Sequence, residues 1–184
     1  MMLDKAVSLA FPISMAIMVL LVTFSITFMQ NDWFFAFMAG ASMGLASWIK
    51  GMIFADPNTM QPLVSVAPRL FVGIAAFAVY RLVLKLLKEE NKRKNQVIAI
   101  TLGTLVGLLV NTVLFLIATS LYSSFLPKGY QSFFALVKGI VFFNILPEYM
   151  ISIIFTPLVV LGVRHGLKLG IDGNNFKRAL KEKS

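Results

Sequence analysis

The sequence contains no cysteine, so it can form neither a disulfide nor a thiolate metal site, and thiol catalysis is excluded. It has one histidine, His165, and only eight acidic residues in 184. This shortage of ligands predicts no metal site, and no cofactor is implied. A Walker phosphate-binding motif is also missing, so any ATP must be hydrolysed by other proteins.

Charged residues are scarce as well, at 14% against about 25% in a typical soluble domain. Hydrophobic residues make up 58% of the chain, and several apolar runs reach the ~20 residues that a helix needs to cross a membrane. The sequence therefore predicts an all-α, polytopic membrane helical bundle of five to six transmembrane helices. Residues 1–169 would form the transmembrane domain and 170–184 a basic cytoplasmic tail. The first apolar run is too long for a cleavable signal peptide.

The net charge of +9 comes largely from two clusters, at 85–94 and 164–183. Basic clusters beside apolar spans are typical of cytoplasmic loops. We therefore expect the positive charge to face the lipid bilayer surface and not nucleic acid.

Five apolar runs predict helices at residues 5–29, 34–54, 64–87, 96–122 and 148–167. A polar turn at 30–32 separates the first two. The connection at 55–66 is rich in polar residues and proline, and we expect it to be non-helical. The apolar segment 132–144 is too short for a comfortable crossing, which predicts a re-entrant or interfacial segment. Pro147 suits the first turn of the final helix, and Pro157 would lie inside it.

Placing both basic clusters in the cytoplasm predicts that the connection 55–66 lies outside the cell. Polar residues near the outer ends of the spans then share one level beneath the external connections. This coincidence predicts a pocket open to the outside, with no water-filled path or ladder of paired charges continuing inward, so the chain alone is not expected to be a channel. The predicted substrate-binding residues are Trp48, Lys50, Asn58, Arg69, Asn111, Asn144 and Glu148.

Arg69 is the most informative of these residues. An arginine at the centre of a span costs roughly 2.5–3.5 kcal/mol on insertion scales, so it usually faces a cavity or a partner. Its guanidinium could pair a ligand carboxylate bidentately or form an ion pair with Glu148. Asn144 and Glu148 would bond neutral groups of the ligand, unless Glu148 only caps its own helix. Asn111 could instead make an interhelical bond, and Lys50 could snorkel to the interface.

Small residues at four-residue spacing predict close contacts between helices. Gly40 and Gly44, with Ala36 one turn earlier, give the 34–54 helix such a face. Ala6 and Ala10 give the first span another.

Three stretches resemble a known family: PLVSVAPRLFVGIAAFAVYRLV, GTLVGLLVNTVLF and NILPEYMISIIFTPLVV. They are similar to the substrate-binding S components of energy-coupling-factor (ECF) vitamin transporters, and most similar to the pantothenate type. The resemblance covers roughly residues 33–168. Its most specific pieces are Pro68-Arg69, Gly103 with Asn111-Thr112, and Asn144 with Pro147-Glu148.

The resemblance implies a non-catalytic subunit of an ECF-type ABC transporter in the bacterial plasma membrane. Such a subunit captures a water-soluble vitamin at the outer face and works with a transmembrane T component and two cytoplasmic ATPases. The family's first helix meets the T component through small residues, to which Ala6 and Ala10 are the nearest match. An S component for hydroxymethylpyrimidine, pyridoxine or folate, and a structural membrane protein, remain alternatives. An enzyme is disfavoured, because Glu148 is the only acid at membrane depth and His165 lies at the cytoplasmic end.

Overall fold

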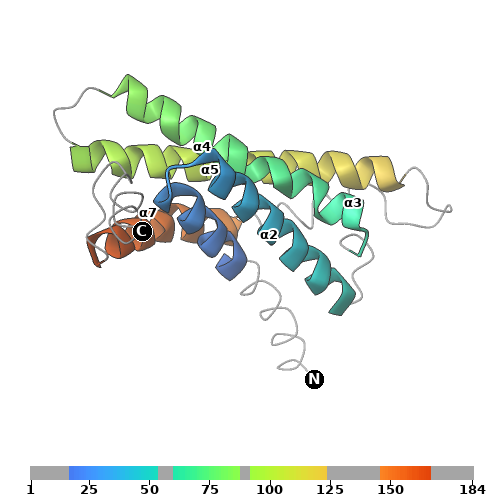
Figure 1. Cartoon of the computed structure of the whole chain (residues 1–184). Helices are drawn as coiled ribbons and strands as arrows, with labels where there is room; N and C mark the ends of the chain where they lie inside the picture. Colours follow the sequence, from blue (N-terminus) through green and yellow to red (C-terminus); the bar gives the residue numbers. More distant parts are fainter. Residues whose placement is uncertain (1–16, 54–59, 88–91, 124–145, 167–184) are drawn as a thin grey trace, which may run out of the picture.

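The computed structural model describes residues 17–53, 60–87, 92–123 and 146–166, and these ranges are almost entirely helical (Figure 1). No strand occurs in these ranges, so the predicted all-α class is confirmed for them. The helices, in chain order, are Ile17–Met29, α2 (Trp33–Ile53), α3 (Pro62–Ser65), α4 (Ala67–Leu86), α5 (Lys92–Ser123) and α7 (Leu146–Gly166).

The turn between helix Ile17–Met29 and α2 has the predicted position, and its residues explain why the chain reverses there. Asn31 has a φ of 50°, a left-handed conformation that asparagine adopts more readily than most residues. Asp32 then caps α2, because its Oδ1 accepts a hydrogen bond from the Phe34 amide at 3.1 Å. Its carbonyl accepts another from the Ala36 amide at 3.2 Å.

The expectation of a non-helical connection at 55–66 is wrong at its end, because α3 is a helical turn that occupies Pro62–Ser65. Proline breaks a helix interior but suits the first turn, where its missing N–H has no partner to lose. Pro62 begins α3 and Pro68 stands in the first turn of α4. The helix therefore starts, is interrupted at Val66 and resumes as α4.

Helix α4 packs against both α2 and α5, and α7 packs against α5. In Figure 1, α4 ends, α5 begins and α7 ends at the left of the molecule. We call this end, marked by Leu86, Lys92 and Gly166, the basic end. The opposite end, where α2 stops and α3 begins, is called the Arg69 end. The arrangement agrees with the predicted topology, which requires the two basic clusters on one side of the membrane.

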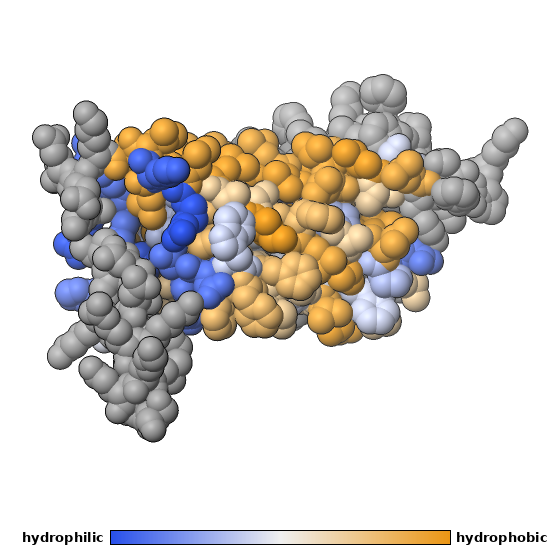
Figure 2. All heavy atoms as spheres, turned by 45° about the horizontal axis from the view of Figure 1, so that its top comes forward, coloured by the Kyte–Doolittle hydropathy of each residue, from blue (hydrophilic) through white to orange (hydrophobic). Residues whose placement is uncertain are grey.

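The surface changes character along the bundle. Figure 2 shows hydrophobic residues over the middle of the visible face and hydrophilic residues gathered at the left. At this basic end Arg81, Lys85, Arg93 and Lys94 are all exposed. Large apolar side chains, among them Met18, Phe37 and Leu109, are exposed along the middle. An apolar exterior with charges at one end is the distribution expected of helices that face lipid.

Three helices in the described residues are long and apolar enough to cross a membrane: Pro62–Leu86, Arg93–Leu121 and Tyr149–Gly166. Helix α2 has 21 residues but is not among them, because its glycines, serines and Lys50 lower its hydropathy. Helix Ile17–Met29 is too short in the described range. The predicted segment 132–144, the tail 170–184, Ala6 and Ala10 lie outside the described residues.

The core at the basic half is aromatic. Phe28 lies between Phe24 and Tyr80, with ring centroids 6.2 Å and 5.2 Å away. Phe77 stacks on Tyr80 at 6.1 Å, and all four rings are at most 1% exposed. Buried aromatic side chains carry a large apolar area and so dominate core energetics. They join helix Ile17–Met29 to α4.

Small residues let the helices approach one another, as the spacing of Gly40 and Gly44 predicts. A Cβ at Gly40 would lie 2.5 Å from the Arg69 carbonyl oxygen, and one at Gly44 would lie 2.9 Å from the Val66 Cα. On the other side of this contact, a Cβ at Gly73 would overlap the Ala36 carbonyl. The backbones of α2 and α4 are thus in direct contact, and the prediction of a close-packing face is confirmed.

Candidate functional site

Arg69 is held inside the bundle by backbone carbonyls of the segment that precedes it. Its side chain is 7% exposed, and Nη1 donates to the Ser65 carbonyl at 2.8 Å and the Val64 carbonyl at 3.2 Å. The guanidinium also lies 4.9 Å from the ring centroid of Phe115, a cation–π contact with α5. Arg69 therefore joins α3 and α4 to α5.

The neighbouring proline explains why these carbonyls are available. In a continuous helix the Val64 carbonyl would accept from the amide four residues later, which is Pro68, but proline has no N–H. The Arg69 amide donates to the Val66 carbonyl at 3.1 Å. It therefore does not donate to the Ser65 carbonyl, its usual partner in a continuous α-helix. The Arg69 side chain supplies donors to both carbonyls. The pair Pro68-Arg69 is thus one structural unit.

Asn111 and Thr112 lie about one turn before Phe115 on α5, at the level of Arg69. Thr112 Oγ1 is 3.0 Å from the Leu108 carbonyl and 3.1 Å from the Tyr149 hydroxyl, which lies in the first turn of α7. Asn111 is half-buried, and its Oδ1 has no hydrogen-bond partner among the described residues. These contacts bring polar groups of α4, α5 and α7 to one level of the bundle.

Trp48 and Lys50 lie near the end of α2, on the same side of the bundle as α3. The Trp48 Nε1 donates to the Met60 carbonyl at 3.0 Å, and both Trp48 and Lys50 are half-buried. Trp48 thereby ties the end of α2 to the residues that lead into α3.

Three predicted site residues stay untested. Asn58 and Asn144 lie outside the described residues. Glu148 falls in the first turn of α7, one residue before Tyr149, but its side chain is also outside the described set. The proposed ion pair between Arg69 and Glu148 therefore remains a prediction.

Tyr149 and Phe115 were not anticipated as parts of this region. An aromatic residue in an apolar helix is usually a core residue. A role in a polar site can be recognised only when the structure shows a polar side chain in contact with it. The polar residue Thr112 at the same depth was the available signal for Tyr149, because a hydroxyl inside an apolar bundle needs a partner.

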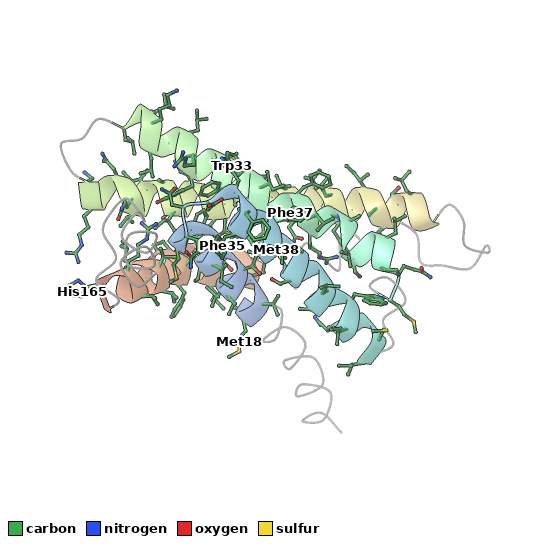
Figure 3. The ribbon with its side chains drawn as sticks, in the orientation of Figure 1. Met18, Trp33, Phe35, Phe37, Met38 and His165 are labelled. Carbon is green, nitrogen blue, oxygen red and sulfur yellow. The ribbon has the colours of Figure 1, made fainter. Side chains whose placement is uncertain are left out.

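The basic end carries His165, the one histidine of the sequence, and a second buried arginine, Arg164. His165 is exposed at the end of α7, at the left of Figure 3, away from the Arg69 end. Groups of three or more histidine, aspartate or glutamate side chains that could hold a metal are not found within the described ranges. Arg164, one residue earlier, is only 5% exposed and donates from Nη2 to the Phe28 carbonyl and the Tyr80 hydroxyl. It therefore anchors helix Ile17–Met29 to α4 and α7.

The Thr112–Tyr149 contact gives a direct prediction about how α5 and α7 are held together. In a double-mutant cycle, Thr112→Val and Tyr149→Phe should show a coupling of about 0.6 kcal/mol, the usual size of such bonds inside membrane bundles. Unfolding of the purified protein in mixed detergent micelles measures it. Leu109→Ala with Tyr149→Phe is the matched control, since Leu109 is exposed, and its coupling should be near zero. Equal coupling in both cycles would contradict the bond.

The Arg69 end therefore combines a buried cation, an amide oxygen, hydroxyl groups and two aromatic rings on several helices. Such a set suits recognition of a small polar molecule that carries a carboxylate, because arginine pairs carboxylates and the other groups fix orientation. Comparisons with protein-family models, with curated proteins and with solved structures gave no match.

Proposed function

We propose that this chain is the substrate-binding S component of an ECF-type vitamin transporter, with five to six transmembrane helices in the bacterial plasma membrane. It captures a water-soluble vitamin, pantothenate in the first place, at the Arg69 end, which faces outward. Transport requires a T component and two ATPases, because the sequence has no nucleotide site of its own.

The observation that carries the proposal is the meeting of the three resembling stretches at one level. The Pro68-Arg69 pair lies on α4, Asn111-Thr112 on α5, and the stretch with Pro147-Glu148 begins α7. Arg69 contacts Phe115, and Thr112 contacts Tyr149, so residues far apart in the sequence converge. Convergent polar groups at the end of a bundle are the usual setting of a small-molecule site.

One observation favours the second candidate, a structural membrane protein without transport. The contacts of Arg69 described above join parts of its own chain, which is what a purely structural arginine would do. The two functions differ in one measurable property, which is affinity for a vitamin.

The test uses the fluorescence of Trp48. The sequence has two tryptophans, and Trp33 lies at the start of α2 with its ring 4.9 Å from Phe77. In Trp33→Phe the signal comes from Trp48 alone, beside the proposed site, whereas Trp48→Phe is the matched control. Pantothenate should change the emission of Trp33→Phe in a saturable way and leave Trp48→Phe unchanged.

The same titration is repeated with hydroxymethylpyrimidine, pyridoxine and folate, and with isothermal calorimetry as a second readout. A response to one of these vitamins instead of pantothenate would reassign the substrate. No heat and no fluorescence change with any vitamin would contradict the proposed function and favour the structural role.

A further inference from the structure

The interior of the bundle contains hydroxyl groups that are buried and unpaired. Thr104, Ser152 and Thr156 are each 0% exposed, and none of their side-chain oxygens has a hydrogen-bond partner among the described residues. The two threonines of helix Ile17–Met29 behave differently. Thr23 and Thr27 donate to the carbonyl four residues earlier, at 2.7 Å and 2.8 Å. Buried polar groups are normally paired with protein or with ordered water, so each exception needs an explanation.

These groups lie along one line of the bundle. Ser152 and Thr156 are four residues apart on α7 and so share one face. Helices α5 and α7 run in opposite directions, with Thr112 against Tyr149. Thr104 is eight residues before Thr112 and Thr156 is seven after Tyr149. At about 1.5 Å per residue, the two hydroxyls therefore lie at nearly the same height.

The directions in which the residues of α5 point around the helix axis indicate that this line runs through the centre of the bundle. A Cβ at Gly103 would meet Ala76 and Phe28, and one at Gly107 would meet Phe24 and Ala76, so these glycines face both helix Ile17–Met29 and α4. Thr112 faces α7. Thr104 and Asn111, seven residues apart, lie between these two directions around the helix. They therefore face the middle of the bundle, where the unpaired oxygens of α7 also lie.

Toward the basic end the line becomes apolar. Val160 follows Thr156 by four residues on the same face of α7, and Ile100 precedes Thr104 by four on α5. Both side chains are 0% exposed. Arg164 comes one turn beyond Val160, where it binds the Phe28 carbonyl. Polar groups thus reach from the Arg69 end to the Thr104–Thr156 level and stop at an apolar layer.

We propose that Asn111, Thr104, Ser152 and Thr156 line a water-filled seam that enters the bundle from the Arg69 end and is closed by Val160 and Ile100. Its walls carry hydroxyl and amide oxygens and no charge, so it takes water and small neutral solutes that hydrogen-bond. Water in the seam supplies the partners that these four side-chain oxygens lack among the described residues. The inference does not depend on vitamin binding, and it differs from the sequence-based expectation that no water-filled path continues inward.

The experiment uses the absence of cysteine, which gives single-cysteine variants without any background. Ser152→Cys, Thr156→Cys and Thr104→Cys are compared with Ile154→Cys, at an exposed apolar position of α7, in lipid nanodiscs. The probe is methyl methanethiosulfonate, which is small, neutral and soluble in lipid, so it reaches every position. The rate of modification then depends on the fraction of each cysteine present as thiolate, because the thiolate is the nucleophile and forms only where water solvates its charge. Intact-mass spectrometry follows the reaction.

We expect the three seam cysteines to react at least about tenfold faster than Ile154→Cys, with a rate that rises with pH as the thiolate fraction grows. Val160→Cys should react as slowly as the lipid-facing control. Thr104→Cys, on the facing helix, gives an independent reading if an α7 variant does not fold. Seam cysteines as slow as Ile154→Cys would overturn the hydrated seam, and a fast Val160→Cys would overturn its closure.

Discussion

Gly73→Ala and Gly40→Ala are each expected to lower the free energy of unfolding by about 1–3 kcal/mol, the usual cost of overpacking a tight core. The added methyl group at Gly73 would overlap the Ala36 carbonyl, and at Gly40 it would lie 2.5 Å from the Arg69 carbonyl oxygen. Both obstacles are backbone, which cannot turn aside as a flexible side chain could. Helices α2 and α4 must therefore move apart along their whole contact. Thermal unfolding in detergent micelles measures the loss.

Gly162→Ala is the matched control for this prediction. It makes the same chemical change on α7, where the added methyl group would meet no atom of the described residues within 4 Å. Because alanine favours a helix over glycine by about 0.8–1.0 kcal/mol, the control should be neutral or slightly stabilising. If Gly73→Ala proves as stable as Gly162→Ala, α2 and α4 are not in backbone contact.

The positions of the helices followed from the sequence because apolar runs and turn residues leave little choice. Residues 34–54 were expected as a helix and α2 occupies Trp33–Ile53; residues 148–167 were expected and α7 occupies Leu146–Gly166. A close contact of α2 through Gly40 and Gly44 also followed, since their spacing marks a face that only a close neighbour can use, but the spacing did not name α4 as that neighbour. The helical turn α3 did not follow, because Pro62 looks the same in a loop and in a first turn.

The burial of the arginines could be predicted only in part. Arg69 stood out because it lies inside an apolar run, but its partners are carbonyls that become available only once Pro68 has interrupted the helix. Arg164 looked like one member of a cytoplasmic basic cluster, and nothing in the sequence set it apart. It is 5% exposed because the chain brings the Phe28 carbonyl, at the end of helix Ile17–Met29, beside it. Carbonyls at the C-terminal end of a helix attract cations. The local sequence around Arg164 does not show that the Phe28 carbonyl will lie beside it.

The unpaired hydroxyls could not be found from the sequence either. Serine and threonine in a membrane helix usually bond the carbonyl four residues earlier, as Thr23 and Thr27 do. Whether Ser152 or Thr156 does the same depends on rotamers and neighbours that only the packed bundle determines. The sequence therefore singled out Arg69 and Asn111 but gave no sign that Thr104, Ser152 and Thr156 would be buried without partners among the described residues.

Arg69→Gln is expected to weaken pantothenate binding by at least about tenfold and also to destabilise the protein. Hydrogen bonds to a charged group contribute about 1.5–3 kcal/mol, and an unsatisfied buried carbonyl costs about 1–3 kcal/mol. If the guanidinium binds the ligand carboxylate, the loss of the charged hydrogen bond lowers the binding free energy. If it binds the Val64 and Ser65 carbonyls, the loss of their donor lowers the free energy of unfolding. Calorimetry measures the affinity, and thermal unfolding measures the stability. Arg93→Gln, at an exposed arginine in the first turn of α5, should change neither.

The variant Pro68→Ala separates the two roles, because alanine restores the backbone N–H that the Val64 carbonyl lacks. In that background Arg69→Gln should cost about 1 kcal/mol less stability, since a backbone donor replaces the lost guanidinium. Pantothenate binding should remain weak in Pro68→Ala/Arg69→Gln, because no backbone amide can replace a cation facing a carboxylate. A double variant that is stable and binds pantothenate as tightly as the wild type would show that Arg69 only repairs the break made by Pro68. Loss of binding with restored stability would establish the arginine as the ligand's ionic partner.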